Sequence, residues 1–497
     1  MPVKADREFR LSVLGFRGAL FLVAFPVLSV LPAHAGDWSI TPRFEVEETY
    51  TDNVTLVTVG KMDDFVTQLR PGLTILGTTP KGQVSASYDL TYLYAADLDK
   101  DTFQHDLAGA FSYQVLPDFL SLTGQATISE QFLSRVGGIS GSRANFTGNR
   151  QTVQGYTISP TVTHRIGDWA NFSANYALGY FKADRGTQNQ PNIPTVTPSF
   201  TQSAVATLGS GNNFYRLRWD MSFRFSETDR SQNRGKFRSK TAQGNLELVL
   251  DRHFSLVGSG GYEKFEDPLL PIGLPDSAIW DFGARLQPGP KSHVEVRYGK
   301  RFGGMTWFAD ASYDFSPRLS FQVNYSENFQ TVQSGLGLLL GNIAIDADGN
   351  LVDVTTGLPF NPADAAFDLS DIAFLQKRLT ASIVVRKGRT SATLQGFVER
   401  RERAVATQSE KGSGATASIS RELNRKTSAD ISFSYQRFDF ADQVRRDRFY
   451  SGRFSVDYKL TKIVSARLSY IGSFRNSTAA LNDINENAVS LSLRASF

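Results

Sequence analysis

Apolar and polar residues alternate along most of the chain beyond residue 37, and the last nine residues show the pattern most clearly. From Val489 to Phe497 every second residue is apolar, and the residues between them are Ser or Arg. Side chains of a β-strand point alternately to its two faces, so this segment predicts a strand with one apolar and one polar face. The same alternation recurs in segments 215–226, 319–326, 453–458 and 464–470.

Two kinds of break interrupt the alternation. Short turns with the residues that suit β-hairpins fall at 79–82, 117–118, 167–168, 209–212, 251–252, 288–290, 316–318, 387–389, 422–425 and 460–462. Mostly longer polar loops fall at 51–63, 97–101, 134–148, 183–198, 229–235, 267–276, 303–305, 334–370, 404–408, 441–446 and 477–485. The two sets interleave, and together they separate about 22 strands.

An alternating chain can form a soluble β-sandwich or a membrane barrel, depending on which face meets water. A sandwich of so many strands needs several domains joined by Pro-rich or Ser-rich linkers, and residues 36–497 contain no such linker. Aromatic residues make up 12% of the chain, which suits a lipid-facing band with interfacial girdles. We predict an all-β fold, a single transmembrane antiparallel β-barrel of about 22 strands (roughly 18–26), with both termini on the short-turn side.

The N-terminus predicts export from the cytoplasm. Four basic residues, the last of them Arg17, precede an apolar run over 18–31, which is followed by the small-x-small triplet 33–35. The run is shorter than the roughly 20 apolar residues of a membrane-spanning helix. We therefore expect residues 1–35 to be a cleaved signal peptide and residues 36–497 to be the barrel. With strands beginning directly after the signal, we expect no separate plug domain of the kind that TonB-dependent transporters carry.

The C-terminal strand resembles the closing strand of bacterial outer-membrane β-barrels, because it ends on an aromatic residue with no polar tail. By that resemblance, Phe497, Leu493 and Leu491 belong to a signal that the barrel-assembly machinery reads. An ordinary amphipathic edge strand would show the same alternation. The expected location is the Gram-negative outer membrane, reached through the periplasm.

Composition narrows the possible chemistry. The chain has no Cys, which excludes disulfides and thiolate metal sites. The net charge of +4 is small for the length, so it does not argue for nucleic acid. None of His105, His164, His253 and His293 has the partners that a Ser-His-Asp site needs, and the sequence has no HExxH or phosphate-binding glycine motif. We predict neither an enzyme nor a bound metal or cofactor.

If the apolar faces meet lipid, the opposite faces line a lumen in which arginines are frequent. The basic candidates on this inner face are Arg216, Arg218, Arg224, Arg285, Arg297, Arg301, Arg453, Arg467, Arg475 and Arg494. Two interpretations remain open. These arginines can pair with acids on neighbouring strands and brace the wall, or unpaired guanidinium groups can form a ladder that favours anions.

The longest predicted extracellular loop, 334–370, is a candidate plug or lid, because loops of this length are usually functional or disordered. Within it, Asp346, Asp348 and Asn350 have the spacing of calcium ligands, but the glycine of an EF-hand loop is misplaced, which favours an Asp-Gly turn. At the other end of the chain, Asp52 and Asn53 also suit a turn, with metal or glycan contact as the minority interpretation.

The stretch from Trp38 to Gly72, which includes the sequence Tyr-Thr-Asp-Asn at 50–53, resembles an outer-membrane β-barrel family associated with PEP-CTERM and exosortase systems. It is more distantly similar to the barrel porins of exopolysaccharide gene clusters. The resemblance covers roughly the first hundred residues after the signal, and no functional residue carries over from it. It implies a Gram-negative outer membrane near polysaccharide production and surface-protein sorting.

The sequence thus supports two functions. The first is a porin-like channel or exopolysaccharide export pore, with outer-membrane lipid, the assembly machinery and anionic polysaccharide as partners. The second is a non-conducting structural or anchoring barrel that holds polysaccharide or surface proteins through its outer loops.

Overall fold

The computed structural model describes residues 36–132, 134–135, 137–184, 197–230, 235–270, 274–289, 291–331, 333–334, 343–345, 351–353, 373–403, 409–440 and 445–497. The strands are β1 (Asp37–Thr51), β2 (Asp64–Thr79), β3 (Gly82–Ala95), β4 (Lys100–Leu116), β5 (Leu120–Phe132), β6 (Arg150–Ile166), β7 (Ala170–Ala183), β8 (Ser199–Ser210), β9 (Leu217–Arg230), β10 (Lys236–Val249), β11 (Phe254–Glu266), β12 (Asp276–Gly289), β13 (Ser292–Arg301), β14 (Gly304–Ser316), β15 (Leu319–Gln330), β16 (Ile343–Ile345), β17 (Leu351–Asp353), β18 (Phe374–Lys387), β19 (Thr390–Arg403), β20 (Ser409–Glu422), β21 (Thr427–Asp439), β22 (Arg446–Lys459), β23 (Val464–Ser477) and β24 (Ile484–Ser496).

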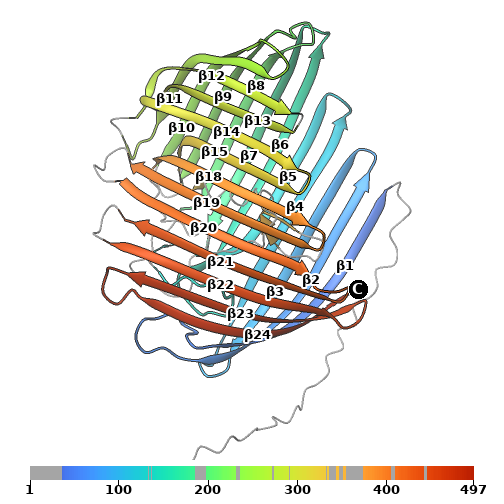
Figure 1. Cartoon of the computed structure of the whole chain (residues 1–497), viewed down its shortest axis with the longest axis vertical. Coiled ribbons are helices and arrows are strands. Elements are labelled where there is room, and N and C mark those ends of the chain that lie inside the picture. Colours follow the sequence, from blue (N-terminus) through green and yellow to red (C-terminus); the bar gives the residue numbers. More distant parts are fainter. Residues whose placement is uncertain are drawn as a thin grey trace, which may run out of the picture.

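All of these strands except β16 and β17 form one antiparallel sheet of 22 strands that closes on itself (Figure 1). Each strand pairs with the next along the chain, and β1 pairs with β24 from Arg43↔Ser496 to Thr51↔Ala488. Closure leaves the sheet without a free edge, which is what a barrel in lipid requires. The prediction of a single antiparallel barrel of about 22 strands is therefore confirmed.

Turn chemistry explains the connections on one side of the barrel. The β6–β7 hairpin is joined by three residues and the β18–β19 hairpin by two, and Gly167 and Gly388 in these turns have positive φ values of 53° and 60°. A residue without a Cβ adopts this backbone conformation readily. The other ends of the strands carry longer connections. The C-terminal end of β24 lies on the short-turn side, where Ser496 pairs with Arg43 of β1.

The outer face of the wall is apolar. Leu217, Met221 and Phe223 of β9 are 49%, 63% and 49% exposed, whereas Ser222 between them is buried. In β24, Leu491 and Leu493 are more than half exposed, whereas Ser490 and Ser492 are buried. Large apolar side chains on the exposed side and small polar ones on the enclosed side match a wall that faces lipid outside and a polar interior inside.

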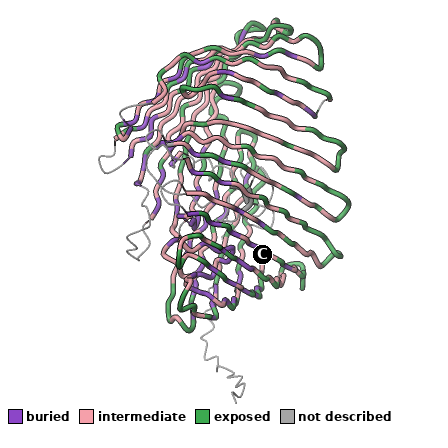
Figure 2. Tube along the Cα trace, turned by 60° about the vertical axis from the view of Figure 1, so that its left-hand side comes forward, coloured by how far each residue is buried: buried purple, intermediate pink, exposed green. Residues whose placement is uncertain are grey.

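Burial changes along the strands. Buried residues, purple in Figure 2, gather toward the ends of the strands that carry the longer connections, whereas the last residues of β4, β6 and β14 next to the short turns are exposed on both faces. The loop ends of the strands are covered because chain segments fold against them from inside. The interior is therefore more accessible from the short-turn side.

Most of the predicted loop 334–370 lies outside the described residues, as do Asp346, Asp348 and Asn350. The described part includes the small hairpin β16–β17, whose strand β16 has Cα atoms within 8 Å of β4. Strand β15, after which this connection starts, stands eleven strands from β4 in a ring of 22, directly across the barrel. The hairpin has therefore crossed from one wall to the other.

Residues 1–35, the predicted signal peptide, also lie outside the described residues, so the division of the chain at residue 36 stays a prediction. Within the described part, β1 begins at Asp37. The same part contains no helix with the length and apolarity to cross a membrane.

Candidate functional site

The interior of the barrel is the candidate site, and its main feature is the connection between β5 and β6. Its described residues, 134–135 and 137–149, fold against the inside of the wall, and we call them the inward segment. Ser140, Asn145 and Asn149 within it are at most 3% exposed. Asn149 holds the segment in shape, because its amide accepts from the Ser134 backbone N–H at 2.9 Å and donates to the carbonyls of Ser134 and Gly138 at 2.8 and 3.0 Å.

Glu486 of β24 anchors the inward segment. Its side chain is fully buried, and its carboxylate accepts hydrogen bonds from Asn145 at 2.5 Å, from Thr51 of β1 at 2.9 Å and from the hydroxyl of Ser140. One acid thus joins the segment to both strands that close the barrel. A buried carboxylate is tolerated only where donors replace water, and these three donors do so.

Arginines of the wall bind the backbone of the inward segment. Arg475 of β23 donates to the carbonyl of Gly137, and Arg453 of β22 donates to the carbonyl of Gly141 at 2.7 Å. Arg150, the first residue of β6, donates to the carbonyls of Ser142 and Arg143 at 2.7 and 2.8 Å. Loop carbonyls enclosed in a barrel need such donors, because no sheet partner satisfies them.

Two arginines of the inward segment reach acids on distant strands. Arg143 pairs with Asp106 of β4, and Arg135 lies 3.7 Å from Glu399 of β19 and 4.0 Å above the ring of Phe438. The contacts therefore extend from β4 through the β1–β24 seam to β19. The segment lines nearly half of the circumference on its inner side.

Apolar packing supports these polar contacts. Ile139 of the segment belongs to a buried cluster with Leu56, Phe132, Phe449 and Ile484. The approach is close, because a Cβ added at Gly138 would lie 2.8 Å from the Cβ of Leu56. Glycine at this position lets the segment pack against the β1–β2 connection.

Asp52 and Asn53, for which the sequence favoured a turn, stabilise the seam. The carboxylate of Asp52 accepts from the backbone N–H and the side-chain amide of Asn487, both at 2.7 Å. The Asn53 amide donates to the carbonyls of Val57 and Asn485 at 2.8 and 3.0 Å. Both side chains are therefore occupied by contacts within the chain.

The wall opposite the inward segment carries a chain of ion pairs across β9–β13. Glu247 lies between Arg218 at 3.6 Å and Arg285 at 3.0 Å, and Glu295 lies between Arg285 at 2.6 Å and Arg297 at 2.5 Å. Arginines and acids alternate, so this wall is close to neutral. It offers hydrogen-bond donors and acceptors side by side along the lumen.

The structure gives eight of the ten arginines predicted to line the lumen an acidic or carbonyl partner. The pairs with acids are Arg218–Glu247, Arg285–Glu295, Arg297–Asp281, Arg301–Glu263, Arg467–Asp457 and Arg494–Glu45, whereas Arg453 and Arg475 hold carbonyls of the inward segment. These contacts favour the bracing interpretation for the eight. Arg216 lies in the turn before β9 and Arg224 faces inward opposite the buried Thr241, both exposed and without an ion pair among the described residues.

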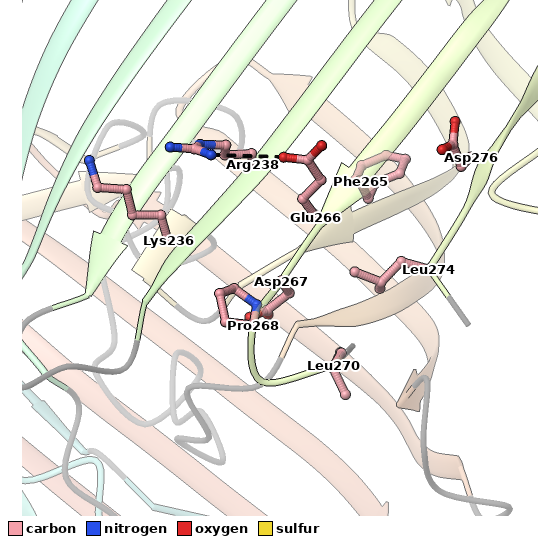
Figure 3. A pocket seen from close by; sticks show the side chains of 9 residues that line it. All are labelled: Lys236, Arg238, Phe265, Glu266, Asp267, Pro268, Leu270, Leu274 and Asp276. Atoms are coloured by element: carbon pink, nitrogen blue, oxygen red, sulfur yellow. Dashed lines mark ion pairs between the residues drawn. The ribbon is translucent and has the colours of Figure 1, made fainter. Parts of the chain in front are cut away.

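A second apolar cluster, with Phe237, Phe265 and Leu270, closes the loop ends of β10–β12 from inside, next to a fully buried ion pair between Arg230 and Asp267. A pocket of about 580 Å³ opens at this rim (Figure 3). Its lining includes Phe265, Leu270 and Asp267. Charged residues of the outer face also line it, among them Arg238 and Glu266, which lie 3.9 Å apart. The described residues contain no group of His, Cys, Asp and Glu able to hold a metal ion.

Sequence reasoning treated residues 134–148 as an ordinary outer loop and missed their inward course. It also missed Glu486, which the alternation of β24 places among lumen residues without distinguishing it from Ser490 or Ser492. The available signal was the composition of 137–149, which is rich in Gly, Ser and Asn and contains no run of charges. Such a stretch packs closely against a wall more readily than a solvated loop does.

Together, the closed sheet, the apolar outer face and the polar interior define an outer-membrane-type β-barrel. The sequence model of the family described as putative beta-barrel porin 2 matches residues 394–497, which span β19 from Leu394 to the end of the chain. The match thus lies at the opposite end from the stretch that carried the resemblance to the PEP-CTERM family. A search of curated protein sequences finds no match.

Solved structures with a similar fold include a mutant of the ferric enterobactin receptor PfeA from Pseudomonas aeruginosa, with a TM-score of 0.50 and 9% identity over 93% of this chain and 81% of that one. The siderophore receptor PirA from Acinetobacter baumannii has a TM-score of 0.47 and 10% identity over 92% and 80%. OccK2 (OpdF) from Pseudomonas aeruginosa, in complex with glucuronate, has a TM-score of 0.37 and 9% identity over 93% and 98%. At such low identity the likeness to PfeA shows the fold alone.

Proposed function

We propose that this chain is a porin-like channel of the Gram-negative outer membrane that passes hydrophilic solutes, with the inward segment narrowing its path. The observation that carries the proposal is the inner wall of β9–β13, where arginines and acids alternate. The strand ends next to the short turns are exposed on both faces, so solutes can reach the interior from that side. A wall of alternating donors and acceptors suits sugar-like solutes, which offer both kinds of group. Its balanced charge predicts only weak ion selectivity.

Arg224 is the residue expected to tilt this selectivity toward anions, because it is exposed on the inner face and has no ion pair among the described residues. A single charge acts through water with about 1 kcal/mol at about 4 Å, so the preference should be modest. With purified protein in planar bilayers under a KCl gradient, the reversal potential should indicate a small anion preference that Arg224→Ser reduces. Arg448→Gln removes a charge from the outer face of β22 and should leave the reversal potential unchanged.

The finer proposal is that the permeant is an acidic oligosaccharide and that the channel operates beside a PEP-CTERM system. It is supported by the resemblance of the first strands and by Arg224 itself, which is exposed on the inner face and has no ion pair among the described residues. Acidic oligosaccharides added to the bilayer chamber should block the current in a concentration-dependent way. A conducting channel that these oligosaccharides do not block would refute the finer proposal, and an absence of conductance both in the wild type and in a variant lacking residues 137–148 would refute the general one.

A second function, a closed anchoring barrel, is favoured by the burial of the loop ends and by the inward segment itself. A variant lacking residues 137–148 separates the two functions. If the wild type is silent and the deletion variant conducts, the segment closes a channel. If neither conducts although both are folded in the outer membrane, as fractionation and heat-modifiable migration would show, the anchoring function is selected.

A further inference from the structure

A charged surface lies on the outside of the barrel, at the loop ends of β15 and β18–β22, away from the lumen. Its cations are exposed or half-buried, and strand pairing shows that they point to the outer face of the barrel. Lys377 and Arg400 oppose each other two residues beyond the pair Leu379 and Val398, so all four side chains share one face. Leu379 and Val398 are 39% and 59% exposed, which identifies this face as the lipid-facing one. We call it the outer basic surface, and it comprises Lys377, Arg400, Lys411, Arg437, Arg446 and Arg448 with the acids Glu327, Glu402 and Asp439.

Six cations face three acids, and the acids are already used. Glu402 lies 2.9 Å from Arg400 and 3.2 Å from Lys377, and Asp439 lies 3.1 Å from Arg437 and 2.8 Å from Arg446. Glu327 lies 4.0 Å from Lys377. Lys411 and Arg448 are exposed and have no ion pair among the residues that the structure describes.

The register places like charges next to one another. Arg400 stands directly opposite Lys377 on one side and Lys411 on the other, and Arg437 stands directly opposite Arg448. Like charges in directly opposed positions of a sheet destabilise it. A folded wall that keeps three such pairs in adjacent strands is stabilised when an anion lies over them, because the anion offsets the repulsion.

The surface lies where lipid headgroups are expected. Tyr435 and Tyr450, with ring centroids 5.1 Å apart, stand on the same face two residues from Arg437 and Arg448 toward the apolar band. Beyond them come Phe433 and Phe454, which are 50% and 42% exposed. Apolar band, tyrosines and then cations follow the order of acyl chains, interface and headgroups.

The excess of positive charge is specific to this side. At the loop ends of β9–β12, part of which Figure 3 shows, the outward residues form a balanced surface with four cations (Lys236, Arg238, Lys240, Lys264) and four acids (Glu227, Asp229, Glu266, Asp276). Its cations include Lys236, which lies 2.8 Å from Glu227, and Lys264, which lies 3.2 Å from Glu266. The same height on the barrel thus carries a neutral surface on one side and a basic one on the other.

We propose that the outer basic surface binds a membrane lipid whose headgroup carries two phosphates, one beside Lys411 and Arg400 and the other beside Arg448 and Arg437. The Cα atoms of Lys411 and Arg448 are two strands and two residues apart, about 12 Å for strand spacings of about 4.8 Å and rises of about 3.4 Å. Guanidinium and ammonium groups are the usual partners of phosphate. The site is independent of what passes through the lumen and requires only that the barrel lies in a membrane containing such a lipid.

The test measures lipid binding to the purified full-length protein in a neutral detergent by native mass spectrometry, with diphosphoryl lipid A as the probe and monophosphoryl lipid A as the comparator. The wild type should bind the diphosphoryl form about tenfold more tightly, as one lost charge-assisted contact implies. Lys411→Gln combined with Arg448→Gln should weaken that binding by about tenfold or more. Lys236→Gln combined with Lys264→Gln removes the same charge from the balanced surface and should change binding by less than about twofold.

Equal affinity for the two lipids, or equal loss in the two double variants, overturns the proposal. So does displacement of the lipid by inorganic phosphate at equal concentration, which would indicate a site for the free anion. A dimer of the barrel that disappears in the Lys411/Arg448 variant would also overturn it, because the surface would then be a protein interface. The double variant is used only if its heat-modifiable migration shows that it is folded. Otherwise lipid binding is measured for each single variant and for the wild type at several salt concentrations. Wild-type binding that does not weaken with added salt refutes the proposal.

Discussion

Replacing Glu486 by Ala should release the inward segment while leaving the barrel closed. The carboxylate of Glu486 accepts from Ser140 and Asn145 of the segment and from Thr51 of the wall. Removing it leaves these buried donors without an acceptor, and each unsatisfied donor costs roughly 1–3 kcal/mol in the free energy of the docked state. The two donors of the segment therefore shift its docking equilibrium by about 2–6 kcal/mol, and water entering the new cavity brings the value toward the lower end. About 2 kcal/mol already reduces the ratio of docked to undocked segment by about thirtyfold.

The docked population can be measured by trypsin cleavage at Arg143, which should be faster in Glu486→Ala, and by single-channel recording, which should show a larger mean conductance. Glu263→Ala is the matched control, because Glu263 is also an inward-facing and fully buried acid but contacts Phe302 and Arg301 rather than the segment. Gly138→Val provides an independent route to the same state, because its side chain would collide with Leu56. If folded Glu486→Ala matches the wild type in cleavage and conductance, the segment does not depend on this anchor and the reasoning is wrong.

Three further predictions concern the inward segment, the buried Arg230–Asp267 ion pair and the C-terminal residue. In a double variant with Gly141→Cys and Ser451→Cys, oxidation should form a disulfide that tethers the segment to β22, because a Cβ at Gly141 would lie 3.0 Å from the Ser451 hydroxyl and the chain has no other Cys. Conductance should then fall, and a reductant should restore it. An unchanged current after complete oxidation would contradict the docked arrangement. Asp267→Ala should destabilise the loop ends of β9–β12 by about 3–5 kcal/mol because it leaves Arg230 buried without its acid, which hydrogen exchange would detect as lost protection there and not at the seam. Phe497→Ala should lower the yield of folded barrel in cells yet hardly change the melting temperature of the folded fraction, because the Phe497 side chain is 70% exposed; an equal loss in both would show that the residue stabilises the fold rather than its assembly.

The strand pattern and the turns could be predicted from the sequence because both are local properties. Alternation with period two and turn residues such as those at 167–168 and 387–389 act within a few residues, and the structure has its hairpins there. The partners of the arginines could not be predicted in this way. That Arg285 lies between Glu247 and Glu295 depends on the register of β10, β12 and β13, which no single strand specifies.

The course of the inward segment was also beyond local reasoning. Loop 334–370 drew attention because of its length, whereas residues 134–149 are shorter and their docking depends on groups brought together only by closure of the barrel. Asp106 and Thr51 come from the first strands, and Glu399, Arg475 and Glu486 come from the last ones. The binding surface therefore does not exist in any contiguous piece of the chain.

This arrangement has a consequence for folding. Because Glu486 of β24 and Thr51 of β1 approach each other only when the β1–β24 seam forms, the inward segment cannot reach its full set of hydrogen bonds before the barrel is closed. Conversely, the docked segment adds contacts from Ser140 and Asn145 across the one seam that joins the two ends of the chain. Docking thus follows closure and stabilises it, so a channel that opens by releasing the segment does so at the expense of its own seam. The contacts of Asp52 with Asn487, which lie at the seam and do not involve the segment, are the ones available to hold the wall closed in the open state.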